Sequence, residues 1–189
     1  MPRRTDSRSR MIHAAAELFC QRGYHATTFS DVVRESGAPR GSTYFHFPGG
    51  KAELGVEAVR RTAEHTARRL AATASSLDAV RLLVTALGNV LRASDFHAGC
   101  AVAGVVLDTT PDEEALLRQT AAAFASWRSA LAEAFRREGA TPAQARRLAV
   151  LVVAAIEGAL MLARADRDIQ PLTDVARELE THVRAVLAR

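Results

Sequence analysis

One stretch near the N-terminus, from Thr27 to Lys51, combines several kinds of side chain that can bind a charged or polar partner. The stretch carries hydroxyl, guanidinium, phenol and imidazole groups, and it ends at the only lysine of the chain. These groups donate hydrogen bonds, and arginine and lysine add the positive charge that attracts a phosphate. The chemistry that these residue types favour is the binding of a polyanion.

Patterns that support catalysis or metal binding do not occur in the sequence. It contains no Ser/His/Asp order, no phosphate-cradling glycine loop and no cluster of metal ligands. His97-x-x-Cys100 is only a pair, which is fewer ligands than a structural zinc site uses. We therefore expect no enzyme activity, no metal and no cofactor.

Lys51 stands where a lysine is unfavourable, at the predicted start of a helix. A cation at that position opposes the helix dipole. The position becomes favourable when an external anion lies nearby, because a helix N-terminus and a lysine can share one phosphate. Lys51 is thus expected to contact the phosphate backbone of DNA.

Short helices are predicted to position these side chains. A helix that begins near Phe29 should end at Gly37, because glycine readily adopts the left-handed conformation of a tight turn. A second short helix is predicted over Arg40–Phe47, with Pro39 in its first turn, and a long helix over Gly50–Thr73 follows. Two short helices joined by a glycine turn are the sequence form of a helix-turn-helix.

In a helix-turn-helix the second helix enters the major groove and reads base edges with its N-terminal residues. Arg40, Ser42 and Thr43 carry donors suited to bases or nearby phosphates, and Gly41 lets the backbone approach DNA closely. The residues expected to contact DNA are Thr27, Thr28, Arg40, Gly41, Ser42, Thr43, Tyr44, His46 and Lys51.

Two phenylalanines of the same helix are expected to face the interior. Phe45 and Phe47 should lock it against the apolar side chains of Phe19, Val32 and Leu54. Both rings are therefore predicted to be core residues that take no part in DNA contact.

A larger pattern emerges when these motifs are taken together. The segments Gly23-Tyr24, Thr27-Thr28, Gly37, Gly41–Phe47 and Lys51–Leu54 resemble the DNA-binding signature of the TetR family of bacterial transcriptional regulators. The resemblance spans about residues 10–60 and is specific, because spacing and residue types agree together. Further along, Gly99–Gly104 and the later helix with Arg164 are similar to the LmrA/YxaF-like subgroup.

The resemblance implies that Thr28, Tyr44 and Lys51 bind phosphate and that the third helix reads bases. Many relatives have a serine or threonine at the place of Pro39, where it caps the third helix and binds a phosphate, so one backbone contact is expected to be missing here. Helix capping alone is the alternative for Thr27 and Thr28, and a half-buried core position is the alternative for Tyr44.

Composition agrees with a helical DNA-binding protein. Residues 1–51 hold eight Arg or Lys and four Asp or Glu, which equals the net charge of +4 of the whole 189-residue chain. A basic head on a neutral body is typical of a nucleic-acid binder. A solvated N-terminus is the alternative, and the arginines at positions 3, 4, 8 and 10 are expected in a disordered tail or in a DNA-contacting arm.

The cellular setting is predicted from what surrounds the cysteines and the apolar runs. Cys20 and Cys100 have apolar neighbours and are expected to be buried free thiols in a reducing cytosol. Glu17 interrupts the N-terminal apolar stretch, and Leu148–Ala163 contains Glu157 and is shorter than a membrane span. The protein is therefore expected to be soluble and cytoplasmic, with no membrane partner.

The predicted fold class is all-α, a nine-helix, two-domain homodimer. Sequence signals for helix starts support this count. Two capping boxes with proline at the first helical position occur, at Thr110-Pro111-Asp112-Glu113 and at Thr141-Pro142-Ala143-Gln144. Pro171 is expected to begin the last helix. Residues 1–50 are expected to form the helix-turn-helix DNA-binding domain. Residues 51–189 are expected to form the effector-binding and dimerisation domain.

A helix-turn-helix protein reads two half-sites of a palindromic operator as a dimer, and the last two helices carry apolar faces for dimerisation. These faces comprise Leu148, Leu151, Val152, Ala155, Ile156 and Ala159, and Leu172, Val175, Leu179, Val183 and Val186. In the family, two such helices per chain form a four-helix bundle. The alternative is that about half of these residues fill the chain's own core.

The family also keeps an effector pocket among its middle helices. The candidates to line it are Asn89, Phe96, Cys100, Val105, Phe124, Trp127, Glu157 and Met161. Glu157 is the only charged residue between Arg147 and Arg164, and a lone carboxylate on an apolar helix requires a partner. That partner is a ligand donor, an arginine or water at the dimer seam, while Trp127 is also a candidate core residue.

The function expected from the sequence is a ligand-responsive repressor that a small lipophilic effector releases from double-stranded operator DNA. The alternative is a non-inducible architectural DNA-binding protein. An enclosed apolar cavity large enough for a drug-sized molecule would argue against that alternative.

Overall fold

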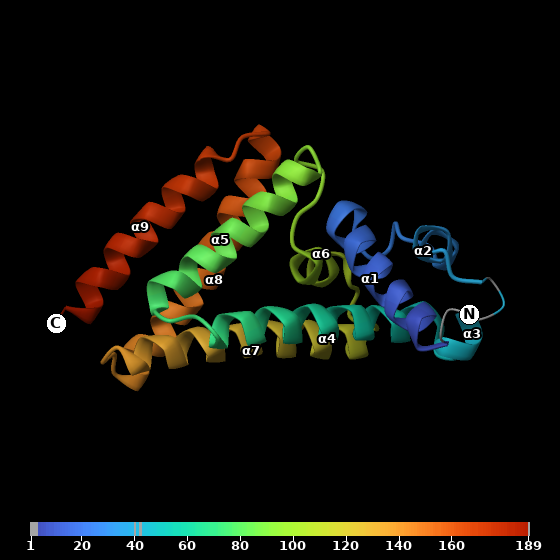
Figure 1. The fold of residues 1–189 in the computed structure, drawn as a ribbon, viewed down its shortest axis with the longest axis horizontal. Helices are drawn as coiled ribbons and strands as arrows, with labels where there is room; N and C mark the ends of the chain where they lie inside the picture. Colours follow the sequence, from blue (N-terminus) through green and yellow to red (C-terminus); the bar gives the residue numbers. More distant parts are fainter. Residues whose placement is uncertain (1–3, 40, 42, 189) are drawn as a thin grey trace. The chain divides into compact units, whose positions relative to one another are not determined.

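The computed structural model describes residues 4–39, 41 and 43–188. For Arg4–Asp6, Thr43 and Tyr44 it describes the backbone but not the side chains. The described residues form nine helices and no strand (Figure 1), which confirms the all-α prediction. The helices are α1 (Arg4–Arg22), α2 (Phe29–Ser36), α3 (Thr43–His46), α4 (Gly50–Ala71), α5 (Ser76–Ala93), α6 (Ala101–Asp108), α7 (Glu114–Arg137), α8 (Pro142–Asp166) and α9 (Gln170–Leu187).

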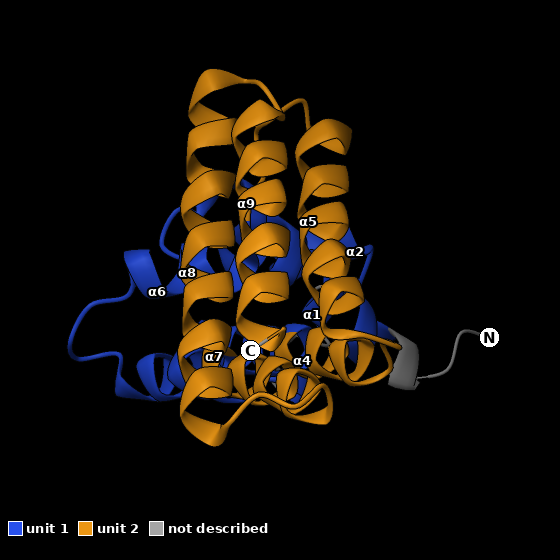
Figure 2. Ribbon diagram, turned by 90° about the vertical axis from the view of Figure 1, so that its left-hand side faces the viewer, with its two compact units in different colours: residues 1–62, 100–123 blue, residues 63–99, 124–189 orange. Residues whose placement is uncertain are grey.

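The chain divides into two compact units (Figure 2). Unit 1 comprises residues 1–62 and 100–123, and unit 2 comprises residues 63–99 and 124–189. Unit 1 thus contains α6 and the first part of α7 in addition to the helix-turn-helix. The boundary between a DNA-binding and an effector domain stays a prediction, since the units are defined by packing and not by what they bind.

Residues at both ends of α2 define where this helix of the helix-turn-helix begins and ends. Thr28 caps α2 in a capping box, in which its hydroxyl accepts from the Asp31 N–H and the Asp31 carboxylate accepts from the Thr28 N–H. The Thr28 hydroxyl also donates to Asp31, and these bonds hold the pKa of Asp31 well below its usual range. Gly37 ends α2 with φ of 59°, the left-handed conformation expected of it.

The third helix differs from its prediction. It was expected over Arg40–Phe47; α3 spans the single turn Thr43–His46, and Arg40 and Ser42 lie outside the described residues. Phe47 is fully buried, but Phe45 is 66% exposed, so the expectation that both rings are core is wrong for Phe45. Phe45 lies within α3, whereas Phe47 follows its last residue, so the two rings do not share one helix face.

Helix α6 packs directly on α1 within unit 1. Cys100 caps α6, and its buried thiol accepts from the Ala103 N–H. A Cβ on Gly104 would lie 3.0 Å from the Phe19 backbone oxygen, which shows how closely the two helices approach. Glycine at this position allows that contact.

The loop after α6 contains the first predicted capping box. The Glu113 carboxylate accepts from the N–H and the hydroxyl of Thr110, as expected, but the helix itself begins at Glu114. The box residues therefore stabilise a turn before α7 and leave the Glu113 side chain beside the loop.

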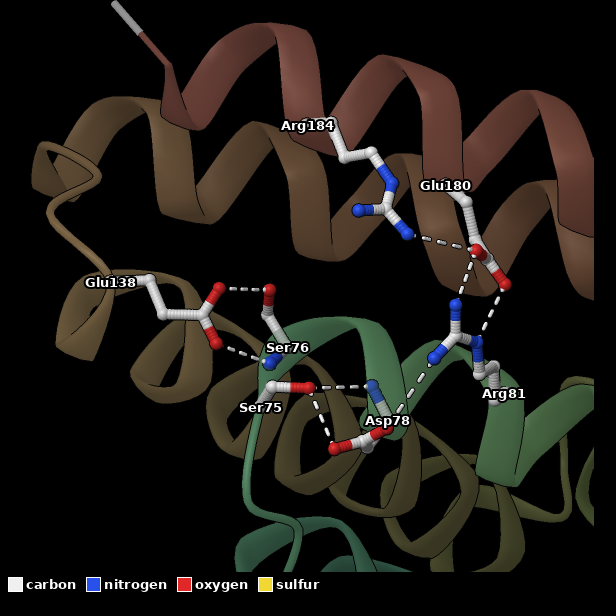
Figure 3. A network of polar contacts seen from close by, with 7 residues as sticks. All are labelled: Ser75, Ser76, Asp78, Arg81, Glu138, Glu180 and Arg184. Atoms are coloured by element: carbon white, nitrogen blue, oxygen red, sulfur yellow. Dashed lines mark hydrogen bonds and ion pairs between the residues drawn. The ribbon is translucent and has the colours of Figure 1, made fainter.

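Unit 2 is built around α5, α8 and α9, which pack against one another. Ser75 caps α5, and the predicted capping box of Thr141 and Gln144 begins α8. A polar contact joins the end of α7 to the start of α5 (Figure 3). The carboxylate of Glu138, just after α7, accepts from the N–H and the hydroxyl of buried Ser76. On the neighbouring face, the guanidinium of Arg81 on α5 donates two bonds to Glu180 on α9, at 2.8 and 2.7 Å.

Among the described residues, α8 is long and apolar enough to cross a membrane by length and composition. Its buried side chains, however, pack against α5 and α9, and 44% of the apolar window is buried inside the fold. Length and composition alone do not make α8 a membrane span, since a helix that packs inside a protein can have the same length and composition.

Candidate nucleic-acid interface

Lys51, in the first turn of α4, lies against the turn that joins α1 to α2. Its ammonium nitrogen is 4.3 Å from the centroid of the Tyr24 ring and 3.3 Å from the backbone oxygen of His25, to which it donates. The ring face attracts the cation, and the carbonyl accepts one of its three N–H groups. The ammonium is therefore held at a defined place in the turn, with two further donors for an external anion.

Close packing places the Tyr24 ring under Lys51. A Cβ on Gly55, one helical turn after Lys51, would lie 2.9 Å from Tyr24 Cε2 and 3.0 Å from Leu116 Cδ2. The absence of a side chain at Gly55 therefore makes room for the ring, which also packs edge-on against Phe19. Burial, together with the nearby Glu113 carboxylate, raises the pKa of Tyr24 to about 12, so its hydroxyl stays neutral.

Two carboxylates hold the same turn, one from the last residue of α6 and one from the loop before α7. The Asp108 carboxylate accepts from the backbone N–H of His25, and Glu113 Oε2 lies 3.0 Å from His25 Nε2. Gly23 has φ of 83°, and a Cβ there would lie 3.0 Å from Asp108 Oδ2. Glycine thus permits both the left-handed turn and the approach of the carboxylate.

The surroundings of Lys51 change the pKa of its ammonium in two opposite ways. Partial burial lowers the pKa of its ammonium, and the carboxylates of Glu113 and Asp108 counteract part of that effect. A phosphate that approaches the ammonium would act in the same direction as the carboxylates, because it favours the charged form.

The two threonines before α2 have different surroundings. Thr27 is 1% exposed and its hydroxyl donates to the Gly23 backbone oxygen at 2.8 Å, so it binds within the turn, while the cap of α2 is Thr28. Thr28 is exposed and forms the capping box of α2. A phosphate role and a capping role are compatible at Thr28, because a hydroxyl has two acceptor positions and one rotatable donor.

The remaining candidates for DNA contact lie in and before α3. Arg40 and Ser42 lie outside the described residues, and only the backbones of Thr43 and Tyr44 are described. Among the described residues, no atom lies within 4 Å of a Cβ built on Gly41, so that part of the fold leaves the Gly41 backbone open to a partner. His46 is half-buried, with its ring beside that of Phe45.

Two of the N-terminal arginines belong to the folded head. Arg8 of α1 donates to Glu57 of α4 at 3.0 Å and lies over the Phe47 ring, and Arg10 donates to the Ser36 backbone oxygen at 2.9 Å. A disordered tail is therefore wrong for these two residues. The sequence did not reveal it, because their partners lie 49 and 26 positions away.

The candidates for an effector pocket do not form one cluster within either unit. Asn89 and Met161 are exposed, Val105 is buried, and Trp127 is buried with its ring N–H donating to the Ala63 backbone oxygen. This burial favours the core alternative for Trp127. Phe124 packs edge-on against Trp127, while Cys100 is occupied as the cap of α6; Phe96 and Glu157 are partly exposed.

A hollow of about 430 Å³ lies elsewhere, between α8 and α9. It is lined by Gln144, Arg147, Leu148, Leu151, His182 and Val186. Three of these residues, Leu148, Leu151 and Val186, were expected at a dimer face, and none was expected in the effector pocket. In the described part of the chain no group of three or more His, Cys, Asp or Glu side chains could hold a metal ion.

Two family models match the chain, one in each half. Residues 11–58 match the model of bacterial regulatory proteins of the tetR family, and residues 76–178 match the C-terminal domain of LmrA/YxaF-like transcriptional regulators. The first match contains the helix-turn-helix and Lys51, and the second contains Asp108 and Glu113.

Whole-length relatives agree with these matches. The chain is 38% identical to the uncharacterized HTH-type transcriptional regulator Rv0196 of Mycobacterium tuberculosis, over 95% of both chains. It is 32% identical to YxaF of Bacillus subtilis, over 97% of this chain and 98% of that one, and 30% identical to LmrA of the same organism, over 90% and 93%.

Solved structures share the fold. A TetR transcriptional regulator from Legionella pneumophila superposes with a TM-score of 0.81 at 20% identity, with 96% of this chain and 98% of that chain covered. The regulatory protein TetR from Rhodobacter sphaeroides superposes with a TM-score of 0.76 at 21% identity, with 92% and 97% covered.

Proposed function

The chain belongs to the TetR family of bacterial transcriptional regulators, with a C-terminal domain of the LmrA/YxaF-like type, and on that premise we propose that it is a repressor which a small lipophilic effector releases from its operator. It is a DNA-binding regulator and not an enzyme. The observation that carries the proposal is the ammonium of Lys51, held at the start of α4 beside a capped helix-turn-helix.

The proposed DNA contacts follow from that geometry. Lys51, Thr28 and Tyr44 bind phosphates and orient the head, while Arg40 and Thr43 read base edges in the major groove together with Ser42. The open backbone at Gly41 lets the start of the third helix approach the bases. The exposed ring of Phe45 lies on the same short helix and adds an apolar contact surface.

The protein acts as a homodimer, because one head covers only half of a palindromic site. Support comes from α8, whose exposed large apolar residues are Val150, Leu151, Met161 and Leu162. Most of the side chains expected at a dimer face, such as Val152 and Leu179, are instead buried within unit 2. The exposed apolar set on α8 is therefore the better dimer surface.

The effector acts by preferring one of two states of the dimer, since a ligand shifts an equilibrium only through its differential affinity. The composition supports a lipophilic ligand, because aliphatic residues are many and aromatic residues make up only 5% of the chain. The protein carries out this role in the cytoplasm.

The proposal is tested in two steps. Purified protein is first used to select binding sequences from a pool of random duplex DNA, and a palindromic consensus is expected. A thermal-shift screen of metabolites and drug-like compounds then supplies ligands for release assays on that duplex. Enrichment of no sequence over the starting pool would refute operator recognition, and binding that no stabilising ligand reverses would favour the architectural alternative.

A further inference from the structure

Asp108, the last residue of α6, and Glu113, just before α7, both bind His25. Asp108 accepts from the backbone N–H of His25, and Glu113 binds its ring, so both main chain and side chain are held. Glu113 itself accepts from the N–H of Thr110 at 2.9 Å. Two residues more than 80 positions away in sequence thus hold the turn between α1 and α2.

The same turn holds Lys51. The carbonyl of His25 accepts from the ammonium, and the ring of the preceding Tyr24 lies beneath it. His25 therefore receives a hydrogen bond from Lys51 through its carbonyl while it donates one to Asp108 through its N–H. Displacement of this one residue changes the position of the ammonium.

We propose that Asp108 and Glu113 are positioning residues for DNA binding, which act through the turn Gly23–His25 to hold the Lys51 ammonium where it meets a phosphate. The inference rests on the proposed function, because it assigns to Asp108 and Glu113 a role in the DNA contact of Lys51. It places the last residue of α6 and a residue of the loop that follows, both outside the helix-turn-helix, in the DNA-binding apparatus.

A simple electrostatic role for the carboxylates predicts the opposite outcome. Two negative charges near DNA repel phosphates, so their removal should strengthen binding. Neither Asp108 nor Glu113 forms an ion pair with Lys51 in the described part of the chain, whereas both contact His25. The hydrogen bonds to the turn are thus the direct contacts, and the charge acts at longer range, where salt screens it.

Substitutions at Asp108 separate the two roles. Asp108→Ala removes both charge and hydrogen-bond acceptor, whereas Asp108→Asn removes the charge and keeps an acceptor for the His25 N–H. The matched control is Glu114→Ala, which removes a neighbouring exposed carboxylate that pairs with Arg118 and does not touch the turn.

Affinity for a random-sequence duplex, measured by fluorescence anisotropy over a series of salt concentrations, gives the readout without a known operator. Asp108→Ala is expected to weaken binding about fivefold, the effect of one lost hydrogen bond, and to lower the salt slope by up to about one unit. Asp108→Asn is expected to bind at least as well as the unmodified chain. Glu114→Ala should not weaken binding.

A double-mutant cycle tests whether Asp108 acts through Lys51. Asp108→Ala combined with Lys51→Ala should bind no more than about twofold weaker than Lys51→Ala alone, because the group being positioned is absent. Glu113→Ala is the second single variant, and it supplies the same cycle if Asp108→Ala does not fold. Thermal unfolding of each variant shows that the protein is folded at the assay temperature.

Several results would overturn the inference. Asp108→Ala that binds as tightly as Asp108→Asn shows that the carboxylate acts by charge alone, and full additivity with Lys51→Ala shows that it acts elsewhere. Failure of the proposed function has a different signature: the unmodified chain then shows no salt-dependent DNA binding, or Lys51→Ala has no effect.

Discussion

At the scale of single residues, Lys51 is held by two groups of different chemistry, a π face and a carbonyl oxygen. Both groups orient the ammonium without neutralising it, in contrast to a direct ion pair. Its positive charge therefore remains available to a phosphate, while the entropy lost on ordering the side chain is already spent in the folded protein. This arrangement favours tight phosphate contact by a single lysine.

Replacement of Lys51 tests the phosphate contact. Lys51→Ala should weaken binding to all duplex sequences to a similar degree and lower the salt slope by about one unit, because one fewer counterion is released. Lys51→Arg is the matched control, since it keeps the charge and can also stack on the Tyr24 ring. An unchanged salt slope in Lys51→Ala would exclude the contact.

A second residue-scale prediction concerns Gly55. Gly55→Ala places a methyl group within about 3 Å of Tyr24 and Leu116, and this overpacking should lower the free energy of unfolding by about 1–3 kcal/mol. Ser129→Ala, at an exposed position of α7, is the control and should change the free energy of unfolding by no more than about 0.5 kcal/mol. Denaturant unfolding measures both, and equal effects would contradict the packing described for the Tyr24 ring.

At the scale of elements, helix ends were the most predictable feature of the fold. Thr28, Ser75 and Thr141 cap helices where side-chain chemistry indicates a start, and Gly37 ends one as expected. These signals are local, since donor and acceptor lie within about three residues. The extent of α3 and the exposure of Phe45 were not predictable in this way, because both depend on how a single turn packs on its neighbours.

The ion pair between α5 and α9 predicts a pH dependence of stability. Hydrogen bonds from Arg81 lower the pKa of Glu180 in the folded protein. A carboxyl whose folded pKa is depressed contributes stability that is fully present above its unfolded pKa of about 4.3 and is lost as pH falls through the folded pKa. Stability should therefore decrease as pH falls below about 4.

Glu180→Gln should remove this contribution and flatten that part of the acid limb in urea titrations at several pH values. Glu178→Gln, an exposed neighbour on the same helix, serves as the control. If both variants keep the slope of the unmodified chain, Glu180 is not the group responsible.

At the scale of the whole molecule, the partition of apolar residues between core and surface decides assembly. The sequence pattern of α8 and α9 does not distinguish core from surface positions, because an apolar stripe looks the same whether it packs on its own chain or on a second copy. Burial of Val152 and Leu179 within unit 2, and exposure of Leu151 and Leu162, resolve it. The proposed effector pocket was unpredictable for the same reason, since its candidates come from segments that pack in different units.

Charge placed on the exposed side of α8 should dissociate the dimer. Leu151 and Leu162 are three helical turns apart and share one side, so Leu151→Glu with Leu162→Glu buries two unpaired carboxylates at the proposed interface. Association should weaken by roughly 3 kcal/mol or more, on the order of 100-fold, as measured by analytical ultracentrifugation. Leu107→Glu on α6, where the side chain is 73% exposed, should leave the dimer intact.

Unit 1 consists of two separate segments of the chain, and this affects how it folds during translation. Its two segments, residues 1–62 and 100–123, are separated by 37 residues that belong to unit 2. Translation proceeds from the N-terminus at about 5–20 residues per second, so the ribosome releases the helix-turn-helix several seconds before it releases α6 and the carboxylates that secure His25. The nascent head therefore emerges with the α6-facing surface of α1 uncovered, and the unit can close only after Ala123 has left the exit tunnel.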